Sequence, residues 1–270
     1  MPPSNRKKRS IPATKRLQVT DDDGWTHVTS GSNVRRVLRK AQTQPGTHLD
    51  LNLEPVLGPS EAPGHLTLSE LQKQYEIHRA RWVESETWGT LAASLDERMR
   101  DLKELGAGLD AIVCIGLGSP SGFLRDGWVD RRSIVMYQLA ALESITQRLS
   151  RLETNIPSFP IYAQDPVFNT LDRALLDSIG VTVLDSPAGF ERITSNSLLF
   201  CPGAERKHLE LVLPSNPRFV FGGPLENTAS EVIQGFVEKM GSRLVVPFMA
   251  NEHAFWKTRL YFRVLEELES

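Results

Sequence analysis

Cysteine and long hydrophobic runs are both scarce in this sequence of 270 residues. The only two cysteines, Cys114 and Cys201, each lie in an apolar run, which argues against a disulfide framework and is typical of a reducing compartment. No stretch of about 18 consecutive apolar residues occurs, and the N-terminus lacks the apolar core of a secretion signal. We therefore expect a cytoplasmic or nuclear protein that has no contact with a membrane.

Several patterns that carry known chemistry are also missing. There is no P-loop lysine and no Gly-x-Ser-x-Gly elbow, because the serines of residues 118–122 occupy other positions. The six histidines show neither His-Glu-x-x-His nor Cys-x-x-Cys partner spacing, so no metal site is expected. The histidine nearest to Cys201, His208, is most of a helix away, which favours a buried structural thiol. The sequence thus identifies no catalytic residue.

The composition that remains is that of a globular protein with a sizeable core. The formal net charge is −2, with 40% hydrophobic and 24% charged residues, which suits one large domain or two small ones. Residues 1–16 carry six Lys and Arg and no acid, a charge of +6 that leaves −8 for the remainder. This segment is expected to be a solvated tail, with phosphate contact or a nuclear address as alternatives, and nucleic-acid binding elsewhere is not favoured.

The chain divides into a lead-in and an α/β domain. Residues 1–66 read as a basic tail and a poorly structured, Pro/Gly-rich segment, interrupted by one short helix around residues 33–41. The domain covers residues 67–270, with a helical lead at 67–105 and a sheet domain at 110–270. Thr67 and Glu70 predict a capping box, and the apolar spacing after them predicts two helices or one kinked helix.

From residue 110 onward, short apolar runs alternate with helical patterns. We predict strands at 111–116, 159–164, 181–185, 197–201, 217–222 and 243–248, and helices near 133–152, 170–179, 205–213 and 229–240. The segment 255–264 fits a strand or a helix equally well. This alternation predicts an α/β fold, a Rossmann-like, doubly wound and mostly parallel sheet with helices on both faces.

In such a sheet, ligands bind beyond the carboxyl ends of the strands, where the predicted loops are rich in turn and polar residues. The candidate ligand-binding residues are Gly116, Gly118, Ser119, Ser121, Gln164, Asp165, Asp185, Glu226 and Asn227. For Asp185 a capping role is favoured over ligand binding, and for Asp165 both roles are left open.

The first of these loops differs from a dinucleotide fingerprint. It reads Gly-x-Gly-x-x-x-Gly, ten residues separate it from the next predicted helix, and Asp165 follows Gly122 by 43 residues instead of about 20. Classical NAD binding is therefore disfavoured. An S-adenosylmethionine or other nucleotide site and a plain tight turn both remain open.

Four segments of the domain resemble one known family. They are Ile112-Val-Cys-Ile-Gly-Leu-Gly-Ser-Pro-Ser121, Gln138-Leu-Ala-Ala-Leu142, Tyr162-Ala-Gln-Asp-Pro-Val-Phe168 and Leu198-Leu-Phe-Cys-Pro202. They resemble the sensitivity-to-red-light-reduced (SRR-like) domain family in its fungal form, as does Trp25-Thr-His-Val28 near the N-terminus. The likeness is good over residues 67–227. One departure is Gly203, which stands where the family pattern has a histidine.

The resemblance implies a regulatory protein, of the kind linked to light signalling and the circadian clock, and makes haem a candidate cofactor. It assigns no reaction and no catalytic residue. Our first hypothesis is thus a regulatory α/β protein that binds a protein partner or a small molecule. The alternative is an enzyme, a nucleotide- or S-adenosylmethionine-dependent transferase using residues 116–122 with Asp165 on the ribose, while nucleic-acid binding through the tail ranks last.

Overall fold

The computed structural model describes residues 58–104, 106–122, 131–152 and 159–264, together with the backbone of two short strands nearer the N-terminus. The chain forms two units, residues 1–56 and residues 57–270. In the first unit, β1 (Leu17–Thr20) pairs antiparallel with β2 (Thr26–Thr29). The sequence analysis does not anticipate this strand pair, and the helix predicted at 33–41 lies outside the described residues.

The second unit begins with two helices, α2 (Leu68–Val83) and α3 (Glu86–Glu104). The predicted capping box is confirmed, because the Thr67 backbone N–H donates to Glu70 Oε2 at 2.8 Å and the Glu70 N–H donates to Thr67 Oγ1 at 3.3 Å. Beyond α3, Gly106 has a φ of +64°, a left-handed conformation that favours glycine at a helix end.

A sheet of seven strands forms the centre of this unit, in the order β5-β4-β3-β6-β7-β9-β8. Its strands are β3 (Ala111–Ile115), β4 (Ile161–Gln164), β5 (Val181–Val183), β6 (Ser197–Cys201), β7 (Phe219–Gly222), β8 (Met240–Leu244) and β9 (Arg259–Arg263). The five strands from β5 to β7 are mutually parallel, and β9 runs antiparallel to both of its neighbours. The predicted mostly parallel α/β sheet is confirmed.

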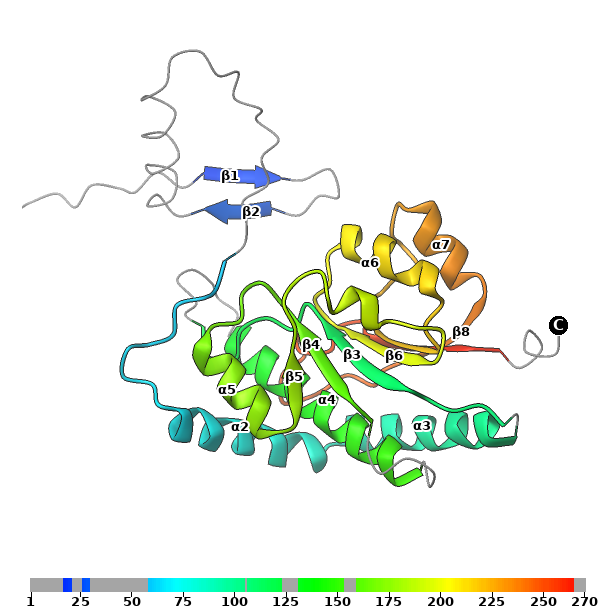
Figure 1. The fold of residues 1–270 in the computed structure, drawn as a ribbon, viewed down its shortest axis with the longest axis horizontal. Coiled ribbons are helices and arrows are strands. Elements are labelled where there is room, and N and C mark those ends of the chain that lie inside the picture. Colours follow the sequence, from blue (N-terminus) through cyan, green and yellow to red (C-terminus); the bar gives the residue numbers. More distant parts are fainter. Residues whose placement is uncertain are drawn as a thin grey trace, which may run out of the picture. The chain divides into compact units, whose positions relative to one another are not determined.

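Helices cover both faces of the sheet (Figure 1). One face packs against α2, α3, α4 (Arg131–Leu152) and α5 (Thr170–Ser178), and the other against α6 (Arg206–Val212) and α7 (Glu231–Val237). In β3, Ile112 and Cys114 enter the first core while Val113 and Ile115 enter the second. Burial on both faces explains why this strand is a continuous apolar run, each large side chain contributing about 1.5–3 kcal/mol.

An aromatic cluster closes the first core. Trp82 is fully buried, with ring centroids 5.5 Å from Phe248 and 4.7 Å from Phe255. Tyr137 of α4 lies 4.7 Å from Phe248. Trp82 is therefore an anchor of this core.

The prediction for the last part of the sheet is wrong in its details. The predicted strand 243–248 is a strand at Met240–Leu244, and the predicted helix 229–240 ends at Val237. Val245 and Phe248 are apolar because they are buried as loop residues and not because they belong to a strand. Pro247 has no backbone N–H to donate to a neighbouring strand. The ambiguous segment 255–264 contains β9.

Candidate functional site

The loops that follow β3, β4 and β6 come together at the carboxyl-terminal edge of the sheet, as predicted for parallel strands. Their approach is very close. A Cβ atom placed on Gly116 would lie 2.8 Å from the Ala204 backbone nitrogen, and one on Gly203 would lie 2.6 Å from the Gly116 carbonyl oxygen. The loop after β6 therefore packs directly on the Gly-x-Gly turn, and residue 203 has no space for the histidine of the family pattern.

Asp165 fixes the Gly-x-Gly turn from the end of β4. Its carboxylate accepts hydrogen bonds from the backbone N–H of Gly118 at 2.7 Å and of Val167 at 3.0 Å. Burial raises the pKa of the Asp165 carboxyl above its ordinary value, and the two N–H donors oppose that shift. Of the two roles left open for this residue, the turn-holding one is what these contacts support.

Ser119 and Ser121 are held by the start of α5. Ser119 Oγ donates to Asp172 Oδ2 at 2.6 Å, and the Ser121 N–H donates to Asp172 Oδ1 at 2.8 Å. The Asn169 side chain caps α5 and also donates to Ser121 Oγ at 2.9 Å. Asp172 is 0% exposed. The sequence analysis missed Asn169 and Asp172, although their Asn-x-x-Asp spacing before a helical pattern is a capping-box signal.

Gln164 also has a structural contact. Its Oε1 accepts a hydrogen bond from the Gly189 N–H at 2.7 Å, and its side chain is buried. A Cβ atom on Gly189 would lie 2.7 Å from Gln164 Cβ. Gln164 thus connects β4 to the loop after β5.

Asp185 stands apart from this network. Its carboxylate is 84% exposed and pairs with Arg173 Nη2 of α5 at 2.5 Å. The described contacts give no support to the predicted capping role, because the side chain forms an ion pair and accepts no described backbone hydrogen bond. Because the loop after β5 is exposed, the Asp185 carboxylate faces solvent and pairs only with Arg173 among the described residues.

Glu226 belongs to a separate polar group after β7. It accepts a hydrogen bond from the Tyr261 hydroxyl at 2.9 Å and forms an ion pair with Arg259, whose Nε lies 2.8 Å from Glu226 Oε1. The Tyr261 oxygen accepts from the Leu225 N–H at 2.9 Å. Burial raises the pKa of Tyr261. Asn227 next to it is exposed. The described contacts join neither Glu226 nor Asn227 to residues 116–122, and a single site formed by the nine candidates stays a prediction.

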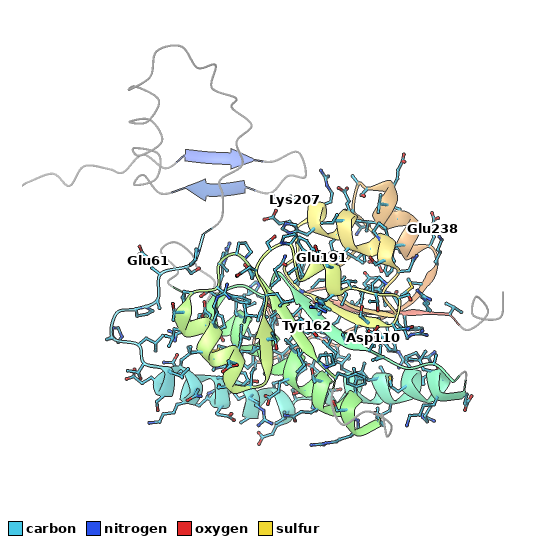
Figure 2. The ribbon with its side chains drawn as sticks, viewed as in Figure 1. Glu61, Asp110, Tyr162, Glu191, Lys207 and Glu238 are labelled. Atoms are coloured by element: carbon cyan, nitrogen blue, oxygen red, sulfur yellow. The ribbon has the colours of Figure 1, made fainter. Side chains whose placement is uncertain are left out.

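Imidazole and thiol chemistry at this edge is limited by packing. His208 of α6 stacks on Phe190 of the short helix η1 (Phe190–Arg192), with ring centroids 5.4 Å apart. Figure 2 labels Lys207 and Glu191, their neighbours on these two elements. Cys201 is buried, as expected, and burial raises the pKa of its thiol to about 12. The burial of Cys201 agrees with the structural role predicted for its thiol.

Two small hollows within the described residues lie away from these loops. Both are shallow, each of about 10 Å³, and lie between α3 and the strands β7, β8 and β9, and neither contains a residue of the loops after β3, β4 or β6. Within the described residues no group of three or more His, Cys, Asp or Glu is placed to hold a metal ion. None of the described helices is both long and apolar enough to span a bilayer.

The loop between β8 and β9 has exposed apolar side chains at the same edge. Met249 is 81% exposed and Trp256 is 56% exposed, while their neighbours Phe248 and Phe255 are buried in the aromatic cluster. Lys257 has a φ of +53°, which is uncommon for a residue other than glycine, and its Nζ lies 4.5 Å from the centre of the Trp256 ring. This loop was not among the predicted sites, because its apolar residues resembled a core strand.

Comparison with known proteins gives one result. No curated protein matches the sequence. The model of the SRR1 domain family matches residues 88–262, which include all of the seven-stranded sheet except the last residue of β9. The fungal form of the family stays a prediction. Because this match covers more than half of the chain, the chain belongs to the SRR1 domain family.

Proposed function

We propose that the chain is a regulatory protein of the SRR-like family that acts by binding a protein partner at the carboxyl-terminal edge of its sheet. Family membership supports a regulatory role. The observation that carries the choice of a partner is the exposure of Met249 and Trp256 at this edge, where residues 203 and 204 fill the space next to Gly116. Exposed tryptophan and methionine are enriched at protein interfaces, whereas a small ligand needs a concave pocket.

The loop that bears these two side chains is anchored on both sides. Phe248 and Phe255 enter the aromatic core, and the Gln138 side chain of α4 donates to the Ala254 carbonyl at 2.9 Å. Thr87 of α3 donates to the Pro247 carbonyl at 3.2 Å. A loop held in this way loses little conformational entropy on binding, which favours a high affinity for a given contact area.

Co-purification from the native cells tests the partner. The tagged full-length chain is compared with Trp256→Ala and Met249→Ala, and with Ile77→Ala of α2 as a control of similar exposure at 54%. We expect a protein whose recovery falls at least tenfold with Trp256→Ala and less with Met249→Ala, but not with Ile77→Ala. Binding of that purified protein to the chain must show the same order. Equal recovery of every protein by wild type and Trp256→Ala would reject the proposal.

The strand order favours a second candidate, a transferase that uses S-adenosylmethionine. Numbered along the second unit, the strands run 3-2-1-4-5-7-6 across the sheet with the seventh antiparallel. This arrangement is typical of S-adenosylmethionine-dependent methyltransferases, and a Gly-x-Gly turn after the first strand with an acid after the second agrees with it. A shared fold does not imply a shared activity.

The residues around the Gly-x-Gly turn do not fit such a cofactor in the described conformation. The backbone of Gly203 and Ala204 fills the space next to Gly116, where the cofactor would have to approach. Both carboxylate oxygens of Asp165 accept backbone hydrogen bonds instead of facing a ribose. Binding would require the loop after β6 to move away from the turn. We therefore derive no reaction through this group.

A ligand screen by thermal unfolding separates the two candidates. S-adenosylmethionine, nicotinamide and adenine nucleotides and haem are tested on the wild type, Gly118→Val, Asp165→Ala and the control Asp185→Ala. A ligand at the Gly-x-Gly turn raises the melting temperature of the wild type and of the control, and loses that effect in Gly118→Val and Asp165→Ala. This outcome would favour the transferase over the partner proposal, which predicts no response to any of these compounds.

A further inference from the structure

The opposite, amino-terminal edge of the sheet contains a cluster of three arginines. Arg98 of α3, Arg218 just before β7 and Arg263 at the end of β9 line one of the two shallow hollows, with a volume of about 10 Å³. Because β9 is antiparallel to β7, the end of one strand meets the start of the other, and Phe219 pairs with Phe262. Three positive side chains from distant parts of the sequence thus border one small space.

Arg218 is the unusual member of this cluster. It is only 6% exposed, and its Nη2 donates to Asn196 Oδ1 at 2.5 Å. Its Nε and Nη1 are buried and have no hydrogen-bond partner among the residues that the structure describes. A guanidinium remains charged in proteins, and a buried charge without a full set of partners is costly.

The acids around the hollow are already engaged with other groups. Arg98 pairs with Glu97 and with Asp101 Oδ2, the latter at 2.9 Å, and lies 4.7 Å above the Phe262 ring. Asp101 also borders the hollow. Arg98 and these two acids together carry one negative charge, so with Arg218 and Arg263 the five side chains sum to one positive charge.

Each of those two arginines has one described hydrogen-bond acceptor. Arg263 Nη2 donates to the Asn216 carbonyl, and Asp110, the acid that favours the charged form of Arg218, accepts a hydrogen bond from Thr194 Oγ1 at 2.8 Å. No ion pair joins Arg218 or Arg263 to a carboxylate within the described part of the chain. Burial, and then the nearby positive charge of Arg263, lower the pKa of Arg218.

We propose that this hollow binds an oxyanion, a phosphate group in particular, through Arg218 and Arg263. A volume of about 10 Å³ admits one oxygen atom of such a group while the rest stays at the mouth. Guanidinium groups suit phosphate because their N–H donors form parallel pairs that match two of its oxygens. The site is independent of the carboxyl-terminal edge and of the partner proposed there.

The test measures thermal unfolding of the full chain in chloride and with increasing inorganic phosphate at constant ionic strength. The variants are Arg218→Met and Arg263→Gln, with Arg173→Gln as the control, because Arg173 is a surface arginine that pairs with Asp185. We expect saturating phosphate to raise the melting temperature of the wild type and of Arg173→Gln by on the order of 5 °C. Arg218→Met and Arg263→Gln should lose this rise. Arg263 is partly exposed, so its variant keeps the test informative even where Arg218→Met does not fold.

Further arms identify the source of the anion. Acetate in place of phosphate should give a smaller rise, since a carboxylate has fewer oxygens and less charge. A phosphate response that is equal in all four proteins, or absent from the wild type, would overturn the proposal. So would a response that appears only after Glu266, Glu267 and Glu269 are changed to Gln, because the chain's own carboxylates would then be the occupant.

Discussion

At the carboxyl-terminal edge of the sheet, the buried acids are paired with hydrogen-bond donors, whereas at the amino-terminal edge Arg218 is only partly paired. Asp172 accepts from Ser119 and Ser121, and Asp165 accepts from Gly118, so the turn-rich loops are held by their own polar groups. Arg218 is equally enclosed, yet two of its N–H groups lack a described partner. Loops rich in glycine, serine and aspartate are thus fixed by hydrogen bonds among their own residues. A buried charge that lacks part of its hydrogen bonds is instead a candidate for ligand binding.

The largest effect is expected at the centre of the satisfied edge. Asp172→Ala removes the acceptor of the Ser119 hydroxyl and of the Ser121 and Asn169 N–H groups, and should lower the free energy of unfolding by about 3–5 kcal/mol. Asp177→Ala, an exposed acid on the same helix, should change it by less than about 0.5 kcal/mol. Urea unfolding measures both. Similar values for the two variants would mean that the network does not stabilise this edge.

A smaller effect should come from the close approach of the loops. Gly116→Ala combines a φ of +73° with a clash against the backbone of residues 203 and 204, and should cost about 3 kcal/mol. Gly180→Ala has a similar φ of +79° with nothing within 4 Å, so it should cost only about 1 kcal/mol. The difference between the two losses in unfolding free energy, measured with urea, gives the contribution of the clash alone. No difference would show that the loop after β6 does not lie on the turn in solution.

The smallest effect concerns the pH dependence of Asp165. Because burial raises its pKa in the folded chain, the native state binds the proton more tightly than the unfolded state does. The resulting stabilisation is present below the ordinary value of about 4 and is lost as the pH rises through the folded pKa. Wild type should therefore lose stability relative to Asp165→Asn between pH 4 and pH 7. Urea unfolding at several pH values measures this trend, and a gain over the same range would contradict it.

The sequence predicted most of the strands because burial on both faces makes them continuous apolar runs. It predicted the cap at Thr67 because a capping box uses residues three positions apart. It failed for 243–248, where apolar residues anchor a loop against the Trp82 cluster instead of forming a strand. It also missed Arg218, since an isolated arginine before an apolar run gives no indication of which side chains surround it.

By itself, the sequence determined the family, the layered α/β fold and the loops that meet at one edge, because periodicity and turn residues are local properties. Only the tertiary structure decided what those loops do: Gly203 packs onto Gly116, Asp165 is occupied by backbone N–H groups, and Glu226 turns to Tyr261 and Arg259. It also brought Arg98, Arg218 and Arg263 together. The physical reason is that hydrogen bonding and charge pairing depend on distances across the fold, and a linear pattern of residues does not contain those distances.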